Sequence, residues 1–206
     1  MIDEGLAEKF ADETGHDLQE LVKHWQGAPE QVAEDLFQAR NPDTGKMESM
    51  EVFPYQAQFL HAYFYSDSII LNTYKGRRIG VSYIACIAMI IDGLRTPNME
   101  FPILATKKGQ AEDRIEDIET ILKSSPLPFD DLVETNNNGE IILYNGTSFK
   151  AYTANPDNAR GITARAVFID EMAFIDGQDE VIEAFMPTIS LGSKGKLVEA
   201  STPKVN

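Results

Sequence analysis

The chain has 206 residues, 43% of them hydrophobic, which is enough to bury the core of one domain with a small appendage. Its one cysteine excludes a disulfide framework within the chain and favours a reducing, intracellular setting. The longest apolar run, Tyr83 to Ile91, is about half a membrane span, and the acidic N-terminus lacks the order of a signal peptide. We therefore expect a soluble, cytoplasmic protein with no membrane partner.

The formal net charge of −15 is unevenly distributed. Residues 1–54 carry 13 acids against 4 bases, a net of −9, and residues 55–206 carry 20 against 14, a net of −6. An acidic surface repels phosphate, so the chain alone should bind DNA weakly. Either an acidic proteome or a basic partner or domain that grips the DNA accounts for this charge.

The N-terminal part differs from the rest of the chain. Residues 1–40 predict two or three short amphipathic helices, because apolar residues recur every three or four positions and glycine and proline interrupt them. Residues 41–50 are typical of a turn-rich connector. We therefore expect an acidic helical segment over 1–54 and a core over 55–206.

From Phe53 onward, buried strands alternate with helices. The expected helices are Tyr55–Tyr65, Val81–Leu94, Lys107–Lys123 and Asp179–Met186, and the expected buried strands are Ser68–Asn72, Phe101–Ala105, Ala166–Ile169 and Lys196–Ala200. Glu140–Tyr144 and Ser148–Tyr152 predict a hairpin around Asn145-Gly146. This order predicts an α/β fold with a mainly parallel sheet covered by helices on both faces. Ligands of such sheets bind at the carboxyl ends of the strands.

The segment after the first of these strands, Lys-Gly-Arg-Arg-Ile-Gly-Val-Ser at 75–82, nearly matches the Walker A pattern G-x-x-x-x-G-K-[ST]. Gly76 and Gly80 allow the backbone to wrap closely around a phosphate, and the helix that follows points its N–H groups at the anion. Ser82 can offer its hydroxyl to Mg²⁺. The alternative is a glycine-rich turn with exposed bases.

Val81 stands where the Walker A lysine belongs, and a valine cannot stabilise charge on a transferred phosphoryl group. Lys75, Arg77 and Arg78 lie in the same loop. A wrapped loop brings its first residue close to the phosphates, so Lys75 is a geometrically plausible replacement. Arg77 or Arg78 can serve as an arginine finger, within the chain or toward a neighbouring subunit.

Two further polar segments follow strands. The apolar run Ala166–Ile169 ends in Asp170-Glu171, which is typical of a Walker B site. Asp170 is placed to hold Mg²⁺, and Glu171 is placed to orient or deprotonate the attacking water. Ser201-Thr202 follow the last strand and can sense the γ-phosphate, although a simple turn is the alternative.

Phe53-Pro54-Tyr55-Gln56 precedes the first core helix. Gln56 can pair with the adenine edge, and Tyr55 can pack on the base. A helix cap with a core aromatic residue is the alternative, and Gln58 is another candidate adenine partner.

Together these motifs resemble the ATPase domain of the large terminase subunit, the DNA-packaging motor of tailed viruses, over roughly residues 53–204. The resemblance rests on PYQ at 54–56, KGRRIGVS at 75–82, ILATKKGQA at 103–111, NARGITARAVFIDEMAFI at 158–175 and ASTP at 200–203. It implies a P-loop fold of the RecA/ASCE-like type that binds ATP and Mg²⁺.

The resemblance also implies roles for single residues. The family includes phosphate loops with the lysine at the loop's start, which Lys75 fits. It implies that Asp170 is the magnesium ligand, that Glu171 is the catalytic acid/base, and that Ser201 and Thr202 form the coupling motif. Arg77 and Arg78 compete for the trigger or finger role. Arg160 is a further candidate for contact with phosphate or with a neighbouring subunit.

The implied function is ATP hydrolysis that drives double-stranded bacteriophage DNA into a preformed capsid, in the cytoplasm of the infected host cell. The implied partners are a portal protein and a small terminase subunit, and the working form is a homo-oligomeric ring. The sequence given stops at Asn206, before the RNase H-like nuclease of family members, so no nuclease activity is expected in this chain.

Two alternatives remain open from the sequence. One is a helicase-type ATPase, which shares these motifs but normally requires a second RecA-like domain. The other is a catalytically inactive nucleotide-binding or interaction module, in which Val81 marks the loss of activity and residues 1–54 form the interaction surface.

Overall fold

The computed structural model describes residues 11–12, 28–76, 79–189 and 195–203. Its helices are α3 (Pro29–Leu36), α4 (Pro54–Tyr65), α5 (Val81–Arg95), α6 (Lys108–Ser124), α7 (Phe129–Leu132) and α8 (Gln178–Phe185), with short 3₁₀ helices η1 (Pro156–Ala159), η2 (Met172–Phe174) and η3 (Met186–Thr188). Its strands are β1 (Gln38–Arg40), β2 (Met47–Ser49), β3 (Ile70–Tyr74), β4 (Glu100–Ala105), β5 (Val133–Asn137), β6 (Glu140–Leu143), β7 (Ser148–Thr153), β8 (Ala166–Asp170) and β9 (Lys196–Ser201).

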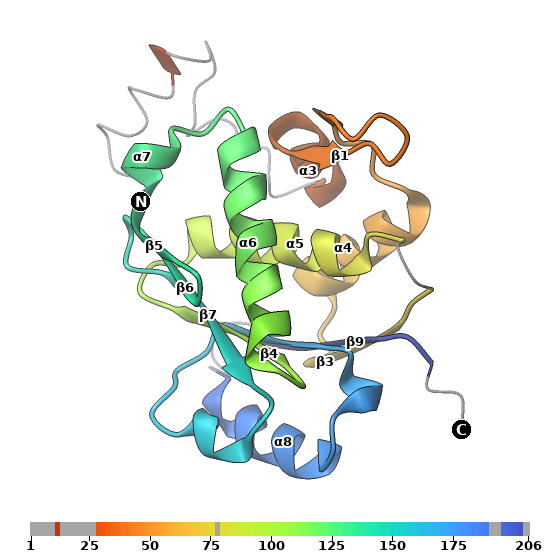
Figure 1. The fold of residues 1–206 in the computed structure, drawn as a ribbon, viewed down its shortest axis with the longest axis vertical. Helices are drawn as coiled ribbons and strands as arrows, with labels where there is room; N and C mark the ends of the chain where they lie inside the picture. The colour runs from red at the N-terminus through yellow and green to blue at the C-terminus, as the bar shows by residue number, and fades with distance from the viewer. Residues whose placement is uncertain (1–10, 13–27, 77–78, 190–194, 204–206) are drawn as a thin grey trace.

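A seven-stranded sheet in the order β3-β9-β8-β4-β7-β6-β5 forms the centre of the fold (Figure 1). The first five strands of this order pair in parallel, and β6 and β5 join through antiparallel pairs. This arrangement confirms the predicted mainly parallel sheet and the predicted hairpin, whose turn contains Gly146 at φ 77°. The four expected helices are also present, with ends within two residues of the predicted ones.

Both faces of the sheet are covered, because successive residues of a strand point to opposite faces. On β8, Phe168 packs into one hydrophobic cluster, while Val167 and Ile169 pack into the other. Helices α3, α4, α5 and α6 lie on the first face, and α8 lies on the second (Figure 1). Helix α5 is buried along most of its length, which explains why its sequence is apolar all round rather than on one stripe.

Two regions differ from expectation. Strand β3 is shifted by two residues from the predicted 68–72, and it forms an edge of the sheet within the described residues instead of a buried strand. Ile70 is 40% exposed and Tyr74 is 83% exposed. Residues 41–46 are a turn as expected, but short strands β1 and β2 flank them, and Asn41 Oδ1 closes the turn by accepting hydrogen bonds from Asp43 N and Thr44 N.

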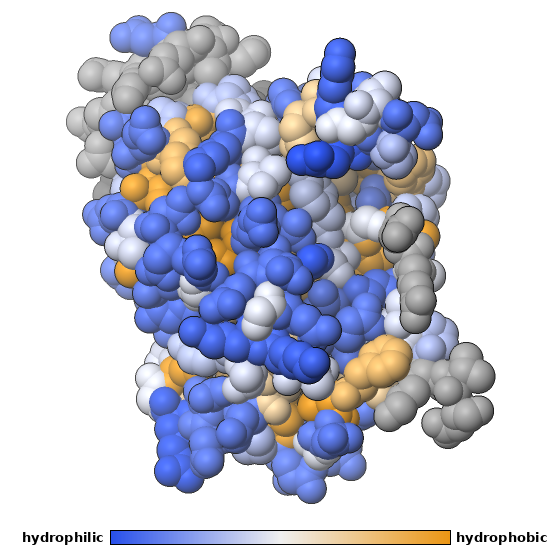
Figure 2. Space-filling view, in the orientation of Figure 1, coloured by the Kyte–Doolittle hydropathy of each residue, from blue (hydrophilic) through white to orange (hydrophobic). Residues whose placement is uncertain are grey.

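Of the helices expected in 1–40, α3 is observed, and residues 1–10 and 13–27 lie outside the described part of the chain. Val32, Leu36 and Phe37 join the cluster that packs under α4. Figure 2 shows that the surface over α6 is predominantly hydrophilic, in agreement with the many charged residues of that helix. Among the described residues, no helix is both long enough and apolar enough to cross a bilayer.

Candidate nucleotide-binding site

Three strands that are distant in sequence bring the polar segments together at one end of the sheet. β9 lies between β3 and β8, with Tyr74 opposite Ser201 and Asp170 opposite Ala200. The residues that follow these strand ends line a cavity of about 550 Å³, together with the start of α5 and part of α6. The predicted convergence of the three segments is therefore present in the structure.

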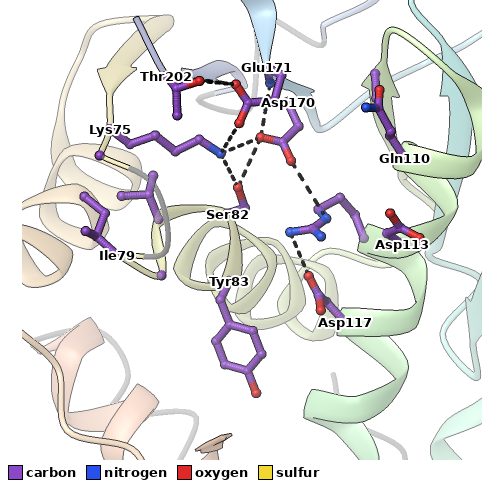
Figure 3. A pocket seen from close by; sticks show the side chains of 15 residues that line it. Lys75, Ile79, Ser82, Tyr83, Gln110, Asp113, Asp117, Asp170, Glu171 and Thr202 are labelled. Carbon is purple, nitrogen blue, oxygen red and sulfur yellow. Dashed lines mark hydrogen bonds and ion pairs between the residues drawn. The ribbon is translucent and has the colours of Figure 1, made fainter. Parts of the chain in front are cut away.

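Lys75, the first residue of the loop, lines this cavity and directs its amine toward Ser82, Asp170 and Glu171 (Figure 3). Its Nζ lies 2.6 Å from Ser82 Oγ, 2.8 Å from Asp170 Oδ1 and 3.4 Å from Glu171 Oε1. The side chain is only 9% exposed, so its ammonium group is held by these oxygens and not by solvent. A buried cation thus lies among Ser82, Asp170 and Glu171, which the sequence predicts to take part in phosphate and metal chemistry.

Ser82 Oγ and Asp170 Oδ1 lie beside each other in the cavity. Ser82 Oγ donates a hydrogen bond to Asp170 Oδ1 over 3.1 Å, and Glu171 N donates to the same Oδ1 over 3.1 Å. A hydroxyl and a carboxylate are the hard oxygen ligands that Mg²⁺ prefers, usually with phosphates and waters completing its shell. No cluster of three or more acidic, histidine or cysteine ligands occurs in the described residues.

Glu171 has an unusual backbone conformation, with φ 54° in the left-handed region. Few non-glycine residues adopt this region, and those that do cluster at functional sites. Its Oε2 accepts hydrogen bonds from Thr202 N over 3.1 Å and from Thr202 Oγ1 over 3.0 Å. Burial alone would raise the pKa of Glu171, but the hydrogen bonds from Thr202 and the charge of Lys75 outweigh burial and hold the pKa below its ordinary value. Glu171 is therefore ionised at neutral pH.

The end of β9 is joined to the site on both sides. Thr202 contacts Glu171, whereas Ser201 Oγ accepts a hydrogen bond from Ala173 N and donates to Thr202 O. Lys75 N also donates to Ser201 O over 3.0 Å, which extends the pairing of β3 with β9 into the loop. Because of these hydrogen bonds, a displacement of this strand end would also disturb the loop and the Asp170-Glu171 pair.

The glycines of the loop have different environments. Gly80 has φ 76°, and a Cβ at this position would lie 2.8 Å from Gln56 Nε2, so only glycine fits here without strain. A Cβ at Gly76 would meet only Ile79 at an ordinary contact distance. Val81 is 4% exposed and packs in the core, so the ordinary lysine position is occupied by a buried apolar side chain. Arg77 and Arg78 lie outside the described residues.

Gln56 lies at the base of the loop. Its Oε1 accepts a hydrogen bond from Phe53 N over 3.0 Å and so caps α4, while its Nε2 lies beside Gly80. Tyr55 donates its hydroxyl to Ile79 O over 2.7 Å, and its ring stacks on Phe53. These side chains border a second cavity of about 670 Å³, which shares part of its lining with the first. Gln58 lines a different cavity, beside β3.

Arg160 lies apart from the cavity. Its side chain is 86% exposed and pairs with Asp157 at 3.0 Å, and it is absent from the described lining of the site. Among the described residues, Arg160 is therefore not brought to the phosphate loop of its own chain.

Sequence reasoning missed the contribution of α6, which adds Gln110, Asp113, Arg114 and Asp117 to the lining. These residues follow β4, which pairs with β8, so the rule that ligands bind at strand ends could have pointed to them. The described lining carries four carboxylates (Asp113, Asp117, Asp170 and Glu171) and two cations (Lys75 and Arg114), a net of 2 − 4 = −2.

The fold is of the α/β class, and its candidate site lies at the strand ends where such folds bind ligands. A family model described as the ATPase domain of the terminase large subunit matches residues 55–205. The chain belongs to this family.

Solved structures of large terminases have the same fold. The large terminase of bacteriophage HK97 aligns with a TM-score of 0.65 and 19% identity over 77% of this chain. The ATPase domain of the Thermus phage P74-26 large terminase aligns with a TM-score of 0.57 and 23% identity over 77% of this chain. The large terminase of a thermophilic bacteriophage, in complex with ADP, aligns with a TM-score of 0.59 and 18% identity over 74% of this chain. The chain spans 35%, 67% and 39% of these three proteins, respectively.

Proposed function

We propose that this chain is the ATP-hydrolysing domain of a large terminase subunit, and that its hydrolysis of ATP powers the packaging of double-stranded viral DNA into a preformed capsid. The observation that carries the proposal is the position of Lys75, whose Nζ reaches both Ser82 Oγ and Asp170 Oδ1 from the start of the loop. A buried cation in the phosphate site is what a working loop needs when Val81 occupies the usual lysine position.

In this proposal the loop residues bind ATP. The backbone around Gly76 and Gly80 and the N-terminus of α5, which begins at Val81, contact the phosphates, and Lys75 supplies the fixed positive charge. Ser82 and Asp170 would hold Mg²⁺, which would neutralise the negative charge on the phosphates during phosphoryl transfer.

Glu171 is the general base. Its carboxylate accepts a proton from the attacking water as the water oxygen bonds to the γ-phosphorus and the bond to ADP breaks. Protonation removes the negative charge that strengthens the hydrogen bonds from Thr202 N and Thr202 Oγ1. The chemical step thereby changes the restraint on the end of β9, and through Ser201 the restraint on η2, which is a physical route for coupling.

The second cavity is the proposed nucleoside site. Gln56 Oε1 is engaged in the helix cap, so its Nε2 is the group that can donate to an adenine acceptor. The stacked rings of Phe53 and Tyr55 are 50% and 42% exposed and offer an aromatic surface to the base.

Arginines complete the proposed active site. Arg160 is exposed and away from its own cavity, which suits contact with the nucleotide of a neighbouring subunit in a homo-oligomeric ring. Arg77 and Arg78, which lie outside the described residues, remain the two candidates for the trigger arginine of the loop.

The proposed organisation is an acidic segment over 1–54 attached to an ATPase core over 55–206. We propose that the domain works in the cytoplasm of the infected host cell with a portal protein and a small terminase subunit. Because of its net charge of −15, the chain alone binds DNA weakly, and the grip on DNA comes from other parts of the motor. The nuclease step is also assigned to other parts of the motor.

The direct test is phosphate release from ATP by the purified chain, with Mg²⁺ and with EDTA. We expect turnover that requires the metal and rises when the chain is added to procapsids with portal protein and duplex DNA. Protein that is folded by circular dichroism and yet neither binds nor hydrolyses ATP would overturn the proposal.

A further inference from the structure

Helix α6 brings a second cation, Arg114, to the acidic pair. Arg114 Nη1 lies 2.9 Å from Asp117 Oδ2, and its Nε lies 3.8 Å from Asp170 Oδ2. Figure 3 shows Asp170 and Asp117 joined by dashed lines to the guanidinium between them. The side chain is 23% exposed and lines the nucleotide cavity.

The two oxygens of Asp170 have different surroundings. Oδ1 accepts hydrogen bonds from Lys75, Ser82 and the backbone of Glu171. Oδ2 faces Arg114. A cation on the Oδ2 side attracts that oxygen and so restrains the orientation of the carboxylate plane, which keeps the other oxygen turned toward the phosphate loop.

The bonding of Arg114 is incomplete. Its Nε is buried and has no hydrogen-bond partner among the described residues. Guanidinium–carboxylate pairs are frequently bidentate. Here Arg114 contacts Asp117 through Nη1, while its Nε lies 3.8 Å from Asp170 Oδ2. Burial alone would lower the pKa of Arg114, but the charges of Asp117, Asp170 and Asp113 hold it above the ordinary value, so the group stays charged.

We propose that Arg114, anchored by Asp117, is a positioning residue that fixes the carboxylate of Asp170 for binding the metal–nucleotide complex. This inference rests on the proposed function, because it assigns Asp170 to the metal. Residues behind a metal ligand typically change metal affinity by about 10–100-fold when they are replaced. Loss of Arg114 should therefore weaken metal binding more than it weakens binding of the nucleotide itself.

The test measures Mn²⁺ binding by electron paramagnetic resonance in the presence of a saturating non-hydrolysable ATP analogue. Arg114→Gln should raise the Mn²⁺ Kd about tenfold or more, while affinity for the analogue in EDTA stays unchanged. Asp117→Asn should shift the Mn²⁺ Kd in the same direction by less. The double variant should resemble Arg114→Gln, because the two residues act through one contact.

Lys108→Gln is the matched control, since it removes an exposed cation from the same helix, and it should leave both affinities unchanged. If Arg114→Gln fails to fold, the Mn²⁺ Kd is measured in two other variants. These are Arg114→Lys, which keeps the charge without the planar fork, and Asp117→Asn.

An unchanged Mn²⁺ Kd in folded Arg114→Gln would overturn the inference and leave the proposed function standing. Equal weakening of metal-dependent and metal-free analogue binding would also overturn it, because Arg114 would then contact the phosphates directly. Wild-type protein that binds no analogue would overturn the proposed function, and this inference with it.

Discussion

Glu171 Oε2 accepts hydrogen bonds from both the backbone N and the side-chain Oγ1 of Thr202, so the proposed base and the first residue beyond β9 form one unit. The two residues are adjacent in space because β8 and β9 are parallel neighbours and end at the same edge of the sheet. The consequence is that the protonation of Glu171 and the position of the residues after β9 are physically linked.

Glu171→Gln should bind ATP with the affinity of the wild type and lose turnover. Glutamine has the same shape and keeps an oxygen for Thr202, but it cannot take a proton from water. General-base catalysis contributes roughly 10²–10⁴-fold, so phosphate release should fall by that factor. Paired measurements of binding and phosphate release check the prediction. Hydrolysis at the unmutated rate would assign the base elsewhere.

Thr202→Val should move the acidic limb of the pH–rate profile to higher pH. The substitution removes the Oγ1 hydrogen bond, which is one of the interactions that hold the pKa of Glu171 below its ordinary value. With that stabilisation lost, the pKa rises, and a higher pH is needed to ionise the base. Thr188→Val removes a hydroxyl that donates to Phe185 O at the end of α8, outside the described lining of the site, and should leave the profile in place. An unshifted limb in Thr202→Val would contradict the link between these two residues.

Cys86 should be inert in the folded protein. The thiol is fully buried in α5, and burial raises its pKa far above the ordinary value, so the reactive thiolate does not form. Ellman's reagent at pH 8 should label the native chain negligibly and label one thiol per chain after unfolding in guanidinium. Rapid labelling of the native protein would show that this part of α5 opens.

Asp92→Ala should destabilise the fold without touching the site. Asp92 accepts hydrogen bonds from Arg165 Nε at 2.8 Å and Nη2 at 3.1 Å, and the pair ties α5 to the residue before β8. Removing one member of a buried ion pair leaves the other uncompensated and costs about 3–5 kcal/mol. Urea denaturation measures this loss in the free energy of unfolding.

Glu112→Gln is the matched control for this prediction. It breaks an exposed pair with Lys108 and should cost less than about 1 kcal/mol. Equal effects of the two substitutions would show that the Asp92–Arg165 contact is not a buried structural link.

The sequence predicts those features that depend on local pattern. The apolar run of α5, the Asp170-Glu171 pair at a strand end and the turn at Gly146 each carry their own signal within a few residues. The order of the strands in the sheet carries no such signal. The sequence pattern places β3 two residues early and wrongly indicates a buried strand, because the limits of β3 depend on pairing with β9, more than 120 residues away.

Arg114 escapes prediction for a related reason. It lies in a run of acidic residues on α6, and such a run normally predicts a solvated helix face. Only the parallel pairing of β4 with β8 brings that face to Asp170. The strand-end rule can point to this helix, but no local spacing in a single sequence indicates the contact of Arg114 with Asp170.

The central claim is that Lys75, and not the residue at position 81, supplies the positive charge that the Walker A lysine normally gives to the phosphates. The measurement is titration of Lys75→Ala and Val81→Ala with a fluorescent ATP analogue and Mg²⁺, at a temperature where both are folded. Val81→Ala should lose about 1–2 kcal/mol of stability through lost packing but bind the analogue like the wild type, because its side chain is buried in the core. Lys75→Ala should weaken binding by about tenfold or more, equivalent to at least ~1.4 kcal/mol. Binding of wild-type strength by Lys75→Ala would contradict the claim.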